Sequence, residues 1–204
     1  MKGKTTRKLQ VCFLTAFLGF LTGCASVVSL HPLVLPNDQD AIFDPALVGT
    51  WQDVDPHDRT VYTVSRAESG YYVVLRPSDP GAAEKREVKL SMHLLKVGDR
   101  RLLDVYIKDL TCDSDACDNY DMQLPVHLFL RLRLDKDSAW LSEMESDWLK
   151  EQIKTRGQLR HEVLTEDHDK VVLTASPGEL RRYLLPYVAD DRSFAHEDEI
   201  RRIK

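Results

Sequence analysis

Two closely spaced cysteines, Cys112 and Cys117, stand out in this 204-residue chain as residues whose type and spacing could carry chemistry. Four residues separate them, so a disulfide between them would staple the tip of a loop. In an exported protein, which folds in an oxidising compartment, a disulfide is the simplest expectation, with two free thiols as the alternative. A structural zinc site ranks last, because no second Cys/His pair lies nearby in the sequence.

Aspartates surround this cysteine pair and could in principle bind calcium. Asp113-x-Asp115 matches the first two ligand positions of an EF-hand loop, but Asp118 stands where glycine is required and Leu124 where the bidentate glutamate belongs. The motif therefore fails, and we predict no metal site. The acidic segment is expected to be a solvated loop; its aspartates are Asp109, Asp113, Asp115, Asp118 and Asp121.

The remaining residues offer no catalytic pattern. Neither His161-Glu162 nor His196-Glu197 is followed by the second histidine of a zinc-protease helix, and the chain contains no Gly-x-Ser-x-Gly, Walker or dinucleotide motif. His93 and His127 alternate with apolar residues and are expected on outward-facing strand positions. We therefore predict no catalytic residue, no cofactor and no enzymatic activity.

The N-terminus has the pattern of an export signal. A basic segment leads into an apolar run over Val11–Leu21, which is too short to span a bilayer. The following Leu21-Thr22-Gly23-Cys24 resembles the bacterial lipobox, in which the signal (residues 1–23) is removed and the new N-terminal cysteine is acylated. Ala25, in place of the aspartate that retains such proteins in the inner membrane, implies anchoring in the outer membrane, facing the periplasm.

Charge excludes one class of partner. The chain has a net charge of −5, and because residues 1–23 carry four positive charges and no negative one, residues 24–204 carry −9. Nucleic-acid binding rests on neutralising phosphates with Lys and Arg, so we predict no nucleic-acid partner.

Residues 24–41 contain prolines without periodicity and are expected to be a tether between the lipid and a domain over residues 42–204. The domain reads as mainly β, because apolar and polar residues alternate in segment after segment. About eight or nine short strands in sequence predict an antiparallel meander that closes into a barrel. The expected strands lie at 48–54, 59–66, 70–76, 87–94, 103–108, 126–134, 138–143, 159–165 and 170–175.

Two helices interrupt this scheme. The first is predicted over about 146–156, where Ser142 or Ser146 could cap the start and Gly157 stands at the expected end. The second, over about 177–186, opens with Ser176-Pro177-Gly178-Glu179, the pattern of a capping box with proline at the first helical position. The tail after it is charged, and we expect a helical tail packed on the barrel.

Gly49-Thr50-Trp51, placed before the strands, resembles the Gly-x-Trp element that opens the lipocalin barrel. The resemblance implies a lipocalin-like fold in which Gly49 allows close backbone approach and Trp51 seals one barrel end. Ser29-Leu30-His31-Pro32-Leu33 and Asp147-Trp148-Leu149 also resemble a group of bacterial lipoproteins that offers no established activity to carry over. The helix inserted between strands departs from the lipocalin pattern.

Two functions follow from these expectations. The first is a lipid-anchored, non-catalytic module whose barrel binds a small apolar ligand. The second is a structural or assembly protein of the cell envelope that acts through protein–protein contacts. The filling of the barrel distinguishes them, because eight strands leave an interior just wide enough for side chains or one small ligand.

The lipobox yields a direct test. We expect the protein to be acylated at Cys24, so that metabolic labelling with a radioactive fatty acid marks it. A Cys24→Ala variant should lose the label, because the thiol is the acceptor of the first lipid. Label retained by that variant would contradict the assignment.

Overall fold

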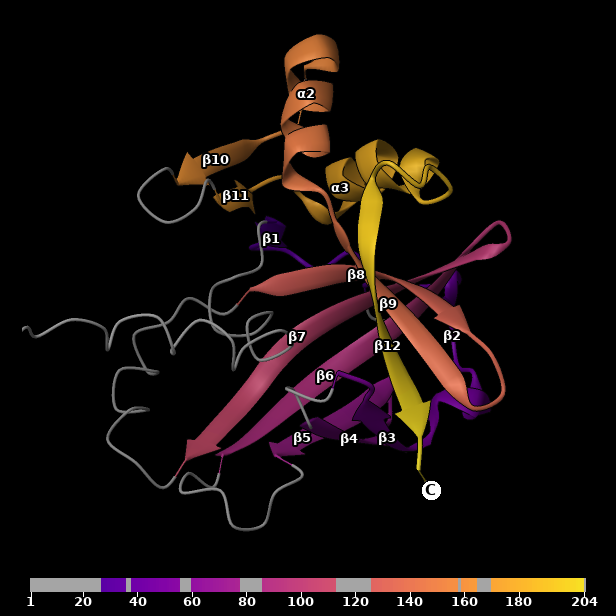
Figure 1. Ribbon diagram of the computed structural model, residues 1–204. Coiled ribbons are helices and arrows are strands. Elements are labelled where there is room, and N and C mark those ends of the chain that lie inside the picture. Colours follow the sequence, from indigo (N-terminus) through magenta and orange to yellow (C-terminus); the bar gives the residue numbers. More distant parts are fainter. Residues whose placement is uncertain are drawn as a thin grey trace, which may run out of the picture.

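The computed structural model describes residues 27–35, 38–55, 60–77, 86–112, 126–157, 159–164 and 170–203 (Figure 1). Among these residues, no helix is long and apolar enough to cross a membrane.

Eight antiparallel strands form a closed barrel, as predicted. Seven of them follow one another as a meander, and the eighth, β12 (Phe194–Arg202), returns to pair with β9 on one side and β3 on the other. Direct pairing of β8 with β9 completes the ring. The meander consists of β3 (Gly49–Asp53), β4 (Thr60–Arg66), β5 (Tyr71–Pro77), β6 (Arg86–Val97), β7 (Arg100–Cys112), β8 (His127–Leu134) and β9 (Ser138–Met144).

The predicted alternation fills the barrel interior. On β6 the inward side chains are Val88, Leu90, Met92 and Leu94, all buried. Inward residues of the other strands, such as Leu130 on β8, pack against them in one cluster. A ring of eight strands leaves room for one layer of interior side chains, which explains why the inward positions are almost all apolar.

A second core lies outside the barrel, over β6, β7 and β8. The outward-facing Leu95, Leu102 and Phe129 are buried in one cluster with side chains of an insertion between β9 and β12. Figure 1 shows the helices of this insertion outside the barrel. β8 is therefore buried on both faces from Leu128 to Leu132. The insertion comprises α2 (Ser146–Arg156), β10 (His161–Leu164), β11 (Lys170–Leu173), α3 (Pro177–Leu184) and the 3-10 turn η4 (Leu185–Tyr187).

Both predicted helices are confirmed. α2 spans the expected residues and ends at Gly157, whose φ of 63° glycine adopts readily, but it starts after Glu145 without a side-chain cap, so neither Ser142 nor Ser146 fills that role. α3 begins with the predicted capping box, in which Ser176 and Glu179 bond each other's backbone N–H groups.

The expectation of a tether over residues 24–41 is wrong for the part of it that the structure describes. β1 (Val27–Ser29) pairs in parallel with β11, and Leu33 and Val34 are buried against the barrel wall. The short apolar segment gains more from covering the outer wall than it would gain as a solvated linker. A two-residue strand, β2 (Ala41–Ile42), then pairs with the end of β6.

The helical-tail expectation is also wrong beyond η4. Residues 194–202 are the barrel strand β12, whereas the predicted strands β10 and β11 lie outside the ring of barrel strands and join it through β1, which pairs with β8. Neighbours of β12 supply hydrogen bonds on both edges, and these outweigh the charged character of Glu197, Asp198 and Glu199.

Trp51 is buried at the barrel end where β3 begins and β12 finishes. A 3-10 turn, η1 (Pro45–Leu47), leads into β3, and the Trp51 Nε1–H donates to the Leu47 carbonyl at 2.9 Å. The Arg202 guanidinium carbon lies 4.1 Å from the centre of the indole ring, and its Nη groups donate to the carbonyls of Val48 and Ala46. The indole is 1% exposed.

Trp51→Ala is expected to lower the free energy of unfolding by about 3–5 kcal/mol, the usual penalty for emptying a buried aromatic site. Trp140→Ala is the matched control, because Trp140 points outward from β9 and lies under Arg133. We expect it to cost less than half as much in urea melts. Equal effects of the two substitutions would contradict the role of Trp51.

Candidate functional site

The barrel interior contains a small apolar cavity of about 60 Å³. Its walls come from all eight strands and from Leu47 at the Trp51 end, with Trp51 and Tyr62 as the large side chains. An apolar cavity of about 150 Å³ is enough to hold one benzene molecule. The interior therefore has room for a few atoms, and side chains occupy the rest of it.

A much larger depression lies beside the tip of the β6–β7 hairpin and the end of β8. It has a volume of about 690 Å³, within the size range of ligand pockets. We call it the cationic groove, because four of its nine lining residues are Lys or Arg. The nine are Ile42, Lys96, Gly98, Asp99, Arg100, Arg101, Leu132, Arg133 and Leu134.

Strand pairing places these cations together. Lys96 on β6 is directly opposite Arg101 on β7, and Arg101 is opposite Leu132 on β8, next to Arg133. The turn through Gly98, which has a φ of 61°, reverses the chain between β6 and β7. The groove thus draws its charge from three neighbouring strands.

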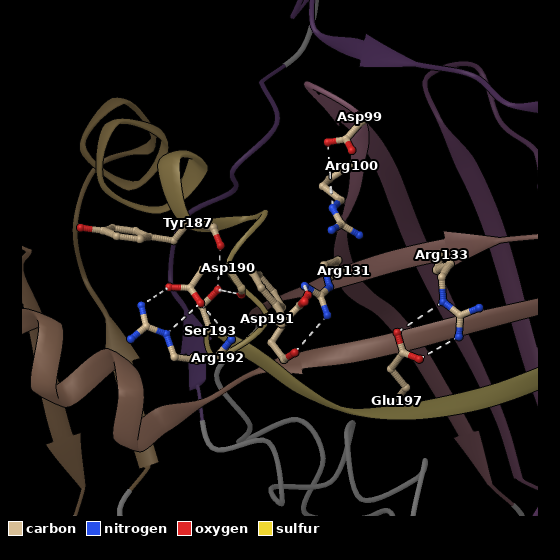
Figure 2. Close-up of polar contacts among 11 residues, drawn as sticks. Asp99, Arg100, Arg131, Arg133, Tyr187, Asp190, Asp191, Arg192, Ser193 and Glu197 are labelled. Carbon is tan, nitrogen blue, oxygen red and sulfur yellow. Dashed lines mark hydrogen bonds and ion pairs between the residues drawn. The ribbon is translucent and has the colours of Figure 1, made fainter.

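The arginines of the groove differ in how closely a carboxylate approaches them. Arg101 lies 2.9 Å from the Asp44 carboxylate, and Arg133 lies 2.8 Å from Glu197 while stacking on the Trp140 ring. Arg100 is paired only loosely, with its Nε 4.0 Å from an Asp99 carboxylate that is 88% exposed (Figure 2). That separation exceeds hydrogen-bonding distance.

A fourth arginine, Arg131, lies outside the groove lining and has a structural role. It is 8% exposed, and its Nη groups donate to the Asp191 carboxylate and to the Phe194 carbonyl (Figure 2). Ser193 Oγ donates to the carbonyls of Tyr187 and Asp190. These bonds order the chain between η4 and the start of β12, so Arg131 positions the closing strand.

Asp104 is a buried carboxylate on the outer wall of β7, 2% exposed. One of its oxygens accepts the backbone N–H groups of Leu33 and Val34, at 2.7 and 3.0 Å. The other lies 2.7 Å from Nδ1 of His127, within hydrogen-bonding distance. A buried charge is tolerated only with such partners, so Asp104 fastens the N-terminal segment to the barrel.

The residues singled out in the sequence fall in three groups. Gly49 and Trp51 lie at the barrel end where β3 begins, and Gly49 has a φ of 144°. Cys24, Cys117 and the aspartates at 113, 115, 118 and 121 lie outside the described residues, and Cys112 is described only in its backbone, at the end of β7. The disulfide therefore stays a prediction.

His93 and His127 do lie on the outer wall, but they are not simple surface residues. His127 bonds Asp104, and its ring lies 5.0 Å from that of Tyr106. His93 Nε2 lies 3.1 Å from Ser69 Oγ. The sequence signal for the Asp104–His127 pair was an aspartate at the centre of an apolar strand. Its backbone partners lie in the segment of Leu33 and Val34, whose packing was not predicted.

The outer wall carries other polar clusters besides the Asp104–His127 pair. Within the described ranges, no group of three or more His, Cys, Asp or Glu side chains is placed to hold a metal ion. Burial, with the neighbouring carboxylates of Asp198 and Glu145, raises the pKa of Glu143 on β9 to about 7. Such like-charge crowding is a feature of the surface between β9 and β12.

Comparison with models of known protein families, with curated proteins and with solved structures gave no match.

Asp104→Ala is expected to destabilise the protein by on the order of 2–4 kcal/mol, because two buried backbone donors lose their acceptor. In this variant the amides of Leu33 and Val34 should also exchange hydrogen faster than in the wild type, whereas the amides of β3 and β4 should not. Asp147→Ala, at a carboxylate that is 93% exposed, is the control and should change stability by no more than about 0.5 kcal/mol. Unchanged exchange at Leu33 and Val34 would contradict the fastening role of Asp104.

Proposed function

We propose that this protein is a lipid-anchored, non-catalytic protein of the cell envelope that acts through its outer surface, in structural or assembly contacts. The anchor is Cys24, and the membrane is the outer one, facing the periplasm. The lipobox pattern and Ala25 support this location.

The filling of the barrel is the observation that carries the proposal. A ligand of ordinary size would need several times the room of the 60 Å³ cavity, and the side chains that fill the space include the fully buried Trp51 and Leu75. Interiors packed in this way resist expansion, because each displaced side chain leaves its rotamer and its contacts. The outer surface, in contrast, offers the cationic groove.

Binding of a small apolar molecule inside the barrel is the second candidate. It is favoured by the lining of the cavity, which is formed almost wholly by apolar atoms, such as those of Val73, Met92 and Leu141. A dry apolar cavity can bind a compact apolar molecule. Its ligand would have to be smaller than benzene.

The absence of catalytic sequence motifs supports a non-enzymatic role. The groove supplies cations and apolar side chains, which suit binding better than acid–base chemistry, since arginine keeps its proton at all ordinary pH values. The Asp104–His127 pair has its carboxylate engaged by the backbone of Leu33 and Val34.

Native mass spectrometry of the full-length protein, purified from its host in a non-ionic detergent, tests the proposal. We expect to measure the mass of the acylated polypeptide without a bound ligand. Solvent extraction should release no molecule from the barrel cavity. The control is Ala139→Val, which fills part of the cavity. A molecule recovered from the wild type and lost in this variant would favour the second candidate and contradict the first.

A further inference from the structure

We propose that the cationic groove is a binding site for a small organic anion, a phosphate or carboxylate group that carries a short apolar chain. This inference names a ligand for the outer surface invoked above. It stands on the groove alone, so it can fail or hold independently of the barrel being empty.

The charge of the groove is the first argument. Residues 24–204 carry −9 overall, yet the groove lining holds four cations against the single carboxylate of Asp99. The carboxylates of Asp44 and Glu197 each engage one of these cations from outside the lining. An excess of positive charge thus remains at one place on an acidic protein, where it attracts anions.

Two of the four cations are available to a ligand. Among the residues that the structure describes, no carboxylate lies within ion-pair distance of Lys96, which points from β6 beside Arg101. Like charges directly opposite each other on paired strands destabilise a sheet. Asp44 offsets the charge of Arg101, and an anion in the groove would offset that of Lys96.

Arg100 is the second cation available to a ligand. Its Nε is buried and has no hydrogen-bond acceptor among the described residues, and its only ion pair is the loose one with Asp99. A buried donor without an acceptor is unfavourable, and an anion in the groove would relieve it. The planar guanidinium suits two parallel hydrogen bonds to a carboxylate or phosphate.

The apolar part of the lining indicates that the ligand carries a short apolar chain beside its anionic group. Ile42 of β2 and the ends of β8 at Leu132 and Leu134 border the same space as the cations. A bare inorganic ion would leave these side chains unused, whereas a short alkyl chain would cover them. The volume of about 690 Å³ accommodates such a molecule, in contrast to the barrel cavity.

Isothermal titration of the full-length protein in a non-ionic detergent tests the inference, with hexyl phosphate as the probe and hexanol and inorganic phosphate as its two halves. We expect hexyl phosphate to bind at least tenfold more tightly than either half, and less tightly as salt is raised, because salt screens the exposed cations. No saturable binding of hexyl phosphate at millimolar concentration would overturn the site.

Variants locate the binding. Lys96→Gln combined with Arg100→Gln should weaken hexyl phosphate binding at least tenfold, with an unchanged midpoint in urea melts. Lys154→Gln, which removes an exposed cation of α2, should leave the affinity unchanged. Equal affinity in the wild type and both variants would place the binding elsewhere and overturn the proposal.

Short-chain lipids separate the two sources of such an anion. If dihexanoyl phosphatidylglycerol binds through Lys96 and Arg100 and dihexanoyl phosphatidylcholine does not bind, the ligand is a lipid headgroup. Binding of hexyl phosphate alone identifies a free organic anion. Both results support an anion site, and binding of the zwitterionic lipid with equal affinity would contradict it.

Discussion

Closure of the barrel by β12 is the constraint on which the rest of the structure depends. The strand is the last in the chain, yet it must fit between β9 and β3, with hydrogen bonds to both. Its final residues bring Arg202 over Trp51, so one contact joins the last barrel strand to the first. Without β12 the sheet would have two exposed edges, which invite association with other chains.

The insertion before β12 makes this closure possible. It folds back on the outer wall of β6 to β8, where Leu95, Leu102 and Phe129 form a second apolar surface. Arg131 then holds Asp191 and the Phe194 carbonyl, which directs the chain into β12. The barrel wall is thus shared by two cores, and a substitution at one position of β8 affects the core on its own face of the strand.

Regular patterns in the sequence predicted most of the fold. Leu90, Met92 and Leu94 alternate with polar residues because one face of β6 meets the interior, and the Ser176–Glu179 capping box marks a helix start locally. β12 was missed because a bulge around His196, which has a φ of 47°, breaks its period of two. A bulge that depends on pairing with distant strands leaves no regular alternation in the local sequence.

The sites were harder to predict than the elements. The burial of Trp51 was predictable from the Gly-x-Trp pattern at the first barrel strand, where a large ring stands beside a glycine. The cationic groove was not, because Lys96, Arg100 and Arg133 come from three strands and meet only through their register. Asp104 was visible as a polar residue on β7, but its partners Leu33 and Val34 belong to a segment without periodicity.

The hydrogen bonds of Asp104 limit how far the protein can reach. They fix the chain at Leu33 and Val34, and β1 is already part of a sheet at Val27. Three residue steps separate Val27 from Cys24, and an extended chain covers about 10 Å in that number. With Cys24 acylated as proposed, the barrel stays close to the bilayer surface, and any partner must meet it there.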